Sequence, residues 1–289
     1  MSDRTYKVVR FFVLLILLCL MGFSGLKVLS IIKGYQDAED EYEMTSEHFV
    51  TVTAYSGVKP GQTGAASTGT ATSSGGEMLS TEGADQTPVY VPEWYELARV
   101  DLAGLRKVNS DICGWILFEN EDISYPILYS GDDDKYLRTT YTGKEATAGS
   151  IFMEGENTPD FMDRHTIIYG HNMRNLSMFG KLKYYRTEEG YYDEHAYFQI
   201  FTEETVYRYM IFSCFQVNAE DPLYTVYGPD ADISDFVNKQ MVKRSKVTSV
   251  GELPEELHVI TLSTCTTGDN RFVVCAALVD EHPLTEDEE

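Results

Sequence analysis

The chain has 289 residues, a length that allows one or two domains, and carries a formal net charge of −23. Such an excess of Asp and Glu argues against a surface that follows nucleic-acid phosphates, because that surface needs clustered Lys and Arg. We therefore expect no nucleic-acid partner. The simplest interpretation of the charge is solubility at a polyanionic surface. Attraction of a cationic substrate segment or an amine acceptor is the alternative.

Residues 11–33 are predicted to form a membrane-spanning helix. The run is almost entirely apolar and reaches spanning length if Lys27, near its end, extends its amine to the interface. Three basic residues within residues 1–10 predict a cytoplasmic N-terminus and an extracytoplasmic remainder. A cleaved signal peptide is the competing interpretation. The length of the run and the lack of an Ala-x-Ala site favour an uncleaved anchor that spans the cell membrane once.

Residues 34–88 are predicted to be a flexible extracytoplasmic linker. Residues 56–87 are mostly Gly, Ser, Thr and Ala and show no apolar periodicity. The short run at residues 48–52 is apolar enough for a stray strand, but it is not assigned to the predicted fold. We place the folded domain at residues 89–289.

The folded domain begins with a predicted helix. Apolar residues recur at helical spacing from Trp94 to Ile112, and Pro92 suits a first helical turn. Eight short runs rich in Ile, Val, Tyr and Phe then predict strands at residues 115–118, 125–129, 149–153, 166–169, 197–201, 206–217, 259–263 and 272–279.

This pattern predicts a mainly β fold. Eight short strands favour a closed barrel over alternating strand–helix units. Between the sixth and seventh strands, apolar residues from Ile233 to Val242 recur at helical spacing and predict an inserted helix.

Three polar residues stand at predicted strand ends. Cys265 ends one apolar run, Arg271 begins the next after a short polar loop, and His171 follows the run at residues 166–170. A cysteine nucleophile, a histidine acid/base and an arginine for an oxyanion form a full set for acyl transfer. The thiol must become a thiolate, and a nearby His helps as proton acceptor or as imidazolium partner.

The other cysteines and histidines are predicted to be structural. Cys19 lies in the membrane run, and Cys113, Cys214 and Cys275 are interpreted as small buried side chains rather than a disulfide framework. The sequence has no His-Glu-x-x-His or paired Cys-x-x-Cys motif, so it predicts no metal site and no cofactor.

The sequence resembles the sortases, the cysteine transpeptidases that attach proteins to the Gram-positive cell wall. The resemblance starts from Thr-Leu-Ser-Thr-Cys at residues 261–265, the strand that Arg271 begins, and Tyr-Gly-His-Asn at residues 169–172. Further landmarks fall in the order of the class B sortases at residues 114–116, 125–127, 136–138 and 149–153. The resemblance covers residues 89–280. It implies an eight-stranded sortase-type barrel with an N-terminal helix and a helix between strands six and seven.

The resemblance also implies roles for individual residues. It assigns Cys265 as nucleophile, His171 as acid/base and Arg271 to the oxyanion or to substrate orientation. The residues that it places near the substrate are Ser263, Thr264, Tyr169, Leu137 and Asp133. Asp133 stands where an amide side chain is expected, so the recognised motif is open.

The resulting expectation is a membrane-anchored class B sortase. It would cleave surface proteins after the Thr of a C-terminal sorting motif and pass them, through a thioester, to an amine on a lipid-linked peptidoglycan precursor. Pilin polymerisation remains an alternative within the family. A secreted cysteine peptidase and a non-catalytic surface adaptor are the alternatives outside it.

Overall fold

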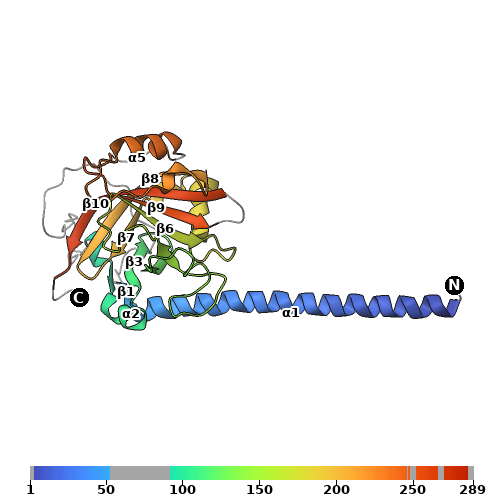
Figure 1. Cartoon of the computed structure of the whole chain (residues 1–289). Coiled ribbons are helices and arrows are strands. Elements are labelled where there is room, and N and C mark those ends of the chain that lie inside the picture. The colour runs from blue at the N-terminus through green and yellow to red at the C-terminus, as the bar shows by residue number, and fades with distance from the viewer. Residues whose placement is uncertain (1–2, 53–91, 246, 248–251, 266–269, 286–289) are drawn as a thin grey trace, which may run out of the picture.

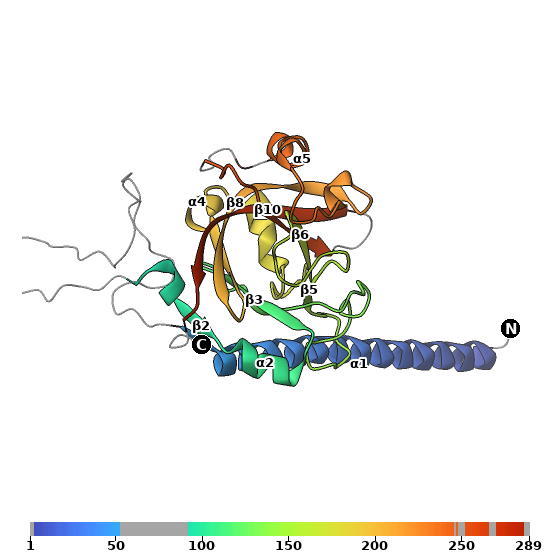
Figure 2. The same cartoon turned by 60° about the vertical axis from the view of Figure 1, so that its left-hand side comes forward.

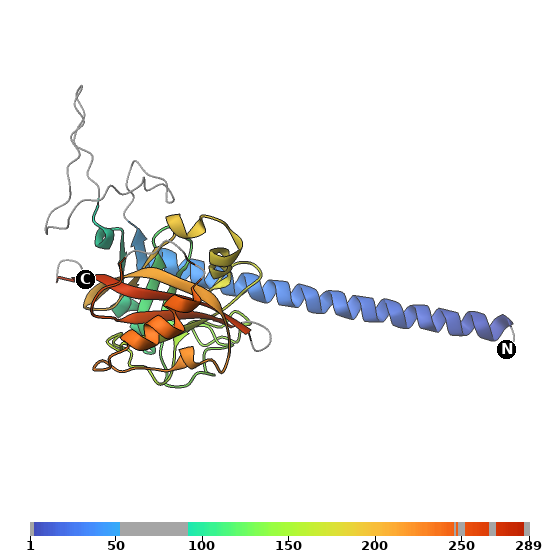
Figure 3. The same cartoon turned by 90° about the horizontal axis from the view of Figure 1, so that it is seen from above.

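The computed structural model describes residues 3–52, 92–245, 247, 252–265 and 270–285. A long N-terminal helix runs past one side of a β-barrel and extends well beyond it (Figure 1). Figures 1 and 3 agree that the arrowhead of β9 (Val259–Cys265) points to the same side as the N-terminal end of this helix. The barrel rim at the end of β9 therefore faces the direction in which the helix extends.

The helix α1 spans Asp3–Phe49. Its 47 residues correspond to a rod of about 70 Å at 1.5 Å per residue. From Leu14 to Ile32 its large apolar side chains are exposed. By length and composition the helix can cross a membrane, a test that a signal sequence near an N-terminus also passes.

The second part of α1 differs from the sequence expectation. Residues 34–49, expected in a flexible linker, are helical, and Ala38, Tyr42 and Thr45 pack against the barrel. The spacing of these three residues puts them on one face of the helix. Because charged residues surround them in the sequence, composition alone does not reveal this face. The linker prediction is thus wrong for residues 34–52, while residues 56–87 lie outside the described part of the chain.

The chain next to α1 forms a small second sheet. Strand β1 (Val50–Val52), which lies in the short apolar run outside the predicted fold, pairs antiparallel with β2 (Ala98–Val100). Figure 2 shows β2 and the short helix α2 (Leu102–Val108) beside the C-terminal part of α1. Residues far apart in sequence thus meet here.

The single helix predicted across residues 94–112 is therefore wrong in extent. The structure has a 3₁₀ turn at Trp94–Glu96, then β2 and then α2. Asp101 begins α2 by accepting a hydrogen bond from the Gly104 amide at 2.7 Å. Pairing of β2 with β1 overrides the local helical periodicity, and sequence spacing alone cannot reveal that pairing.

The eight-stranded barrel is confirmed. It closes in the order β10-β8-β7-β3-β4-β5-β6-β9, and β4–β5 and β6–β9 are its parallel pairs. Its strands are β3 Ile112–Phe118, β4 Ser124–Leu128, β5 Ile151–Met153, β6 His165–His171, β7 Tyr197–Phe201, β8 Thr205–Asn218, β9 and β10 Asn270–Pro283.

The helix expected between the sixth and seventh barrel strands is present as α5 (Ser234–Gln240), followed by the 3₁₀ turn η4 (Val242–Arg244). Short helical segments that the sequence did not predict are η2 Gly180–Lys183, α3 Tyr184–Thr187, α4 Tyr191–Glu194 and η3 Pro222–Tyr224.

Alternating side chains of β9 and β10 enter two separate cores. Ile260 and Leu262 belong to the main core inside the barrel, whereas Val259 and Val273 join a smaller core that includes Val237 of α5. This period of two assigns each strand residue to the inner or the outer face. It therefore also indicates which face the residues at the strand ends occupy.

Ile116, fully buried on β3, tests the main core. Ile116→Ala should lower the free energy of unfolding by about 2 to 5 kcal/mol, because it removes buried methyl groups and leaves a cavity. Urea denaturation would measure this. The control is Val279→Ala at a 38% exposed position of β10, which should cost less than about 1 kcal/mol. Equal losses would contradict the assigned core.

Candidate functional site

Strands β6 and β9 bring His171 beside Cys265. The two strands are parallel, and their pairing runs from His165 opposite Val259 to His171 opposite Cys265. Neighbouring strands lie about 4.8 Å apart, so the two candidate residues occupy adjacent positions at the same barrel rim. Each is the last residue of its strand.

Strand β10 brings Arg271 to the same position from the other side of β9. The pairing of these antiparallel strands reaches Phe272 opposite Thr264, and Arg271 and Cys265 are next on their strands. Residues at opposite positions share a face of a sheet. Because Phe272 belongs to the inner core, alternation puts its neighbour Arg271 on the outer face.

His171 is oriented by the backbone of Leu137. Its Nε2 lies 2.7 Å from the Leu137 carbonyl oxygen. A carbonyl oxygen can only accept, so Nε2 carries a proton and donates it to this bond. Nδ1 is then the nitrogen at which a proton can be exchanged.

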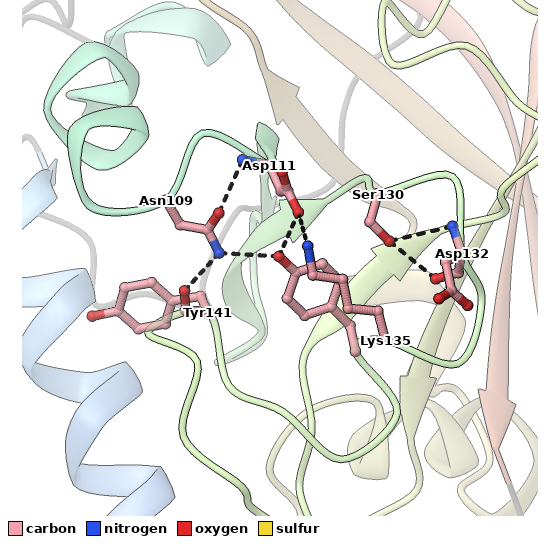
Figure 4. A network of polar contacts seen from close by, with 7 residues as sticks. Asn109, Asp111, Ser130, Asp132, Lys135 and Tyr141 are labelled. Atoms are coloured by element: carbon pink, nitrogen blue, oxygen red, sulfur yellow. Dashed lines mark hydrogen bonds and ion pairs between the residues drawn. The ribbon is translucent and has the colours of Figure 1, made fainter.

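A polar network anchors the chain around Leu137. Lys135 binds the Asp111 carboxylate at 2.5 Å, and the Asn109 side chain donates to the Tyr141 carbonyl at 2.7 Å (Figure 4). Tyr136 donates its hydroxyl to Asp111 at 2.8 Å. The hydrogen bond from Lys135 holds the pKa of Asp111 below its usual value, so this network persists at neutral pH.

Tyr169 and Asp133 meet at Glu154, a residue that the sequence did not single out. The Tyr169 hydroxyl donates to the Glu154 carboxyl at 2.6 Å, and Asp133 accepts from the Gly155 amide at 2.7 Å. Burial, together with the nearby Asp133, raises the pKa of Glu154. Burial and Glu154 also raise the pKa of Tyr169, which keeps its hydroxyl protonated. A Glu just after a strand carries no distinctive sequence signal.

Ser263 is covered by Tyr224, a second residue that sequence reasoning missed. The two hydroxyls lie 2.8 Å apart, and the Tyr224 ring stacks on Tyr169 with centroids 6.3 Å apart. Asp221 holds this turn through the Leu223 amide and two 2.8 Å bonds from Arg244. The Arg244 guanidinium lowers the pKa of Asp221. The Asp-Pro start of the turn was the available sequence signal.

Thr264, expected near the substrate, instead helps to hold β9 against β10. Its side chain is buried and exchanges two 3.0 Å hydrogen bonds with the backbone of Phe272. These bonds join β9 to β10 immediately before the site. Of the residues expected near substrate, Tyr169, Asp133 and Ser263 are connected through Glu154 and Tyr224, whereas Leu137 contributes its carbonyl to His171.

The remaining cysteines of the barrel are not poised for reaction. Cys214 and Cys275 are fully buried and form no disulfide. Burial raises the pKa of Cys275 and that of Cys113 to about 12, so both thiols are protonated at neutral pH. In the described part of the chain, no group of three or more His, Cys, Asp or Glu could hold a metal ion.

Comparison with known proteins identifies the family. The Sortase domain model matches residues 119–279. Sortase B of Listeria monocytogenes is 36% identical over 170 residues, which cover 58% of this chain and 68% of that protein. The chain belongs to the sortase family, in class B.

Solved structures agree with this assignment. Clostridium perfringens sortase B is 29% identical with a TM-score of 0.56, and the match covers 62% of this chain and all of that one. A Staphylococcus aureus sortase B–substrate complex is 26% identical with a TM-score of 0.57, covering 62% of this chain and 84% of that one. This sortase is therefore a cysteine transpeptidase.

The cysteines of this sortase should differ sharply in reactivity. With iodoacetamide at pH 8 and peptide mapping by mass spectrometry, Cys265 should be alkylated in the native protein. Cys214 and Cys275 should react only after unfolding, because both are fully buried and the thiol of Cys275 also stays protonated. Cys265→Ala is the control, which should remove the native-state adduct. Rapid native labelling of Cys275 would contradict this assignment.

Proposed function

We propose that this sortase is anchored in the membrane and attaches surface proteins to the cell wall through a thioester on Cys265. The observation that supports this most is the alignment of His171, Cys265 and Arg271 on three adjacent strands at one rim. Three residue types needed for acyl transfer meet there on a barrel whose relatives are sortases.

In the proposed first half-reaction, the Cys265 thiolate attacks the carbonyl carbon of the Thr in a C-terminal sorting motif. A carbon–sulfur bond forms, and the carbonyl electrons move to the oxygen, which the Arg271 guanidinium stabilises. His171 gives a proton from Nδ1 to the leaving amine, since Nε2 is held by the Leu137 carbonyl. The carbon–nitrogen bond breaks and leaves a thioester.

In the second half-reaction, an amine of a peptidoglycan precursor attacks the thioester. His171 takes the proton of this amine, a new amide bond forms, and the carbon–sulfur bond breaks to restore the thiolate. Atoms and electrons balance without a cofactor.

The surroundings of Cys265 suit a peptide substrate. Tyr224 and Tyr169 offer stacked aromatic surfaces, and the Asp133–Glu154 pair offers carboxyl groups beside them. A Staphylococcus aureus relative has been solved with a substrate, which supports a substrate-binding role for this chain. The carboxyl of Asp133 differs from the amide expected in the family, so we expect a correspondingly altered sorting motif.

The helix α1 supports a membrane location. Its apolar part extends beyond the barrel on the side to which β9 points. We infer that residues 11–33 cross the membrane, residues 1–10 are cytoplasmic and the barrel is outside. The rim that holds Cys265 then faces the bilayer, where a lipid-linked amine acceptor would be found.

Replacing the nucleophile is the first test. Cys265→Ala should abolish transfer of a sorting peptide to an amine, because no thioester can form. Chromatography of the reaction products with the full chain in detergent would measure this, and circular dichroism would confirm the fold. Cys113→Ala is the control and should retain activity. Turnover by Cys265→Ala, or hydrolysis alone by the wild type, would contradict the proposal.

The roles of Arg271 and His171 can be distinguished with substrates that differ in their leaving group. Arg271→Lys loses the planar donors, so acylation should slow by about 100- to 1000-fold for any substrate. His171→Ala should fail with the amide substrate because the leaving amine lacks a proton.

An activated ester, whose leaving group needs little protonation, should partly rescue His171→Ala but not Arg271→Lys. Stopped-flow measurement of acylation would compare the two variants. Equal rescue of both would show that the two roles are wrongly assigned.

A further inference from the structure

The docked part of α1 contacts the segments on both sides of His171. Tyr42, only 4% exposed, lies at the centre of this contact. On one side its hydroxyl binds residues 149–150, which pack against the segment of Leu137. On the other side its ring packs against Tyr125, which binds the loop that follows His171.

The first connection leads from Tyr42 to the carbonyl that orients His171. Tyr42 donates its hydroxyl to the Gly149 carbonyl at 2.8 Å and lies 3.0 Å from the Ser150 hydroxyl. Gly149 has a φ of +56°, and a Cβ added there would lie 2.5 Å from the Leu137 carbonyl oxygen. The backbone held by Tyr42 is thus packed directly against the hydrogen-bond acceptor of His171.

Ser150 strengthens the same connection. Its amide donates to the Tyr136 carbonyl at 3.0 Å, and its hydroxyl donates to the Thr139 carbonyl at 2.7 Å. Residues 136–139 are therefore bound on both sides of Leu137 by a residue that Tyr42 contacts.

The second connection leads to the loop at residues 172–179. The Tyr42 and Tyr125 rings meet edge to face at 5.5 Å, and the Tyr125 hydroxyl accepts from the Met178 amide at 3.0 Å. Met178 has a φ of +53°, a strained value that surrounding contacts must maintain. The next residue, Phe179, donates its amide to the His171 carbonyl at 3.0 Å.

We propose that Tyr42 is a positioning residue for His171, through which the docking of the membrane-proximal helix α1 sets the geometry of acyl transfer. The proposal rests on the proposed role of His171. The effect of Tyr42 on His171 is indirect. Tyr42 acts by holding residues 149–150 and Tyr125 in place.

Tyr42 can affect catalysis in this way because proton transfer tolerates only small changes in the position of the general acid. A general acid must lie within about 2.6 to 3.2 Å of its partner, and small displacements of a catalytic group are costly. If residues 149–150 relax, the Leu137 carbonyl can move and the imidazole loses its fixed tautomer and orientation. Substrate binding depends on other surfaces, so kcat should change more than KM.

Tyr42→Phe tests this directly, because it keeps the ring and removes the hydroxyl. The matched control is Tyr141→Phe at the same interface. Figure 4 shows the Tyr141 side chain pointing toward α1, where its hydroxyl bonds Thr45 rather than Gly149 or Ser150. Each variant loses one hydroxyl group at the contact between α1 and the barrel, so both melting temperatures should fall by a few degrees.

With the full chain in detergent, Tyr42→Phe should lower kcat for a sorting peptide by about tenfold at nearly unchanged KM. Tyr141→Phe should keep both values. Equal kcat in the two variants would overturn the proposal, because α1 would then contribute stability alone.

A second readout does not depend on activity. In ¹⁵N NMR spectra, the Nε2–H signal of the His171 imidazole should shift in Tyr42→Phe and stay unchanged in Tyr141→Phe. An unchanged spectrum in Tyr42→Phe would overturn the positioning role. If the wild type transfers no acyl group, the proposed function fails, whereas the imidazole signal still decides whether Tyr42 positions His171.

Discussion

The parallel pairing of β6 with β9 is the constraint on which the site depends. It joins residues 94 positions apart in the chain and makes His171 the neighbour of Cys265. A shift of one residue would turn His171 to the other face, because side chains alternate along a strand. Several bonds fix this pairing, including the 2.8 Å contact between His165 and Thr261. Burial lowers the pKa of His165 to about 4, so this contact stays neutral at physiological pH.

The helix α1 adds a second constraint to the barrel. Its exposed apolar half and its docked half form one continuous element, so the barrel is held beside the proposed anchor instead of on a free tether. The orientation of the rim that holds Cys265 then follows from helix packing. The contacts of Tyr42 extend this constraint to the surroundings of His171.

The sequence was sufficient for the barrel, and the structure brings the three candidate residues to one rim, while their catalytic roles stay a prediction. Strand β10 contains a continuous apolar run that Arg271 precedes, and Cys265 stands at the end of β9. The docked half of α1 could not be predicted, because its apolar face is narrow and lies among charges. Glu154 and Tyr224 were missed for a related reason. They join the site through tertiary contacts with Tyr169 and Ser263 that no local pattern reveals.

The most direct test of the account is to trap the acyl-enzyme. The full chain would be mixed with a sorting peptide in the absence of an amine acceptor, quenched in acid, digested and mapped by mass spectrometry. The account predicts a thioester adduct on the peptide that contains Cys265, which hydroxylamine removes. An adduct on another cysteine, or cleavage of the peptide with no adduct at any time, would contradict it.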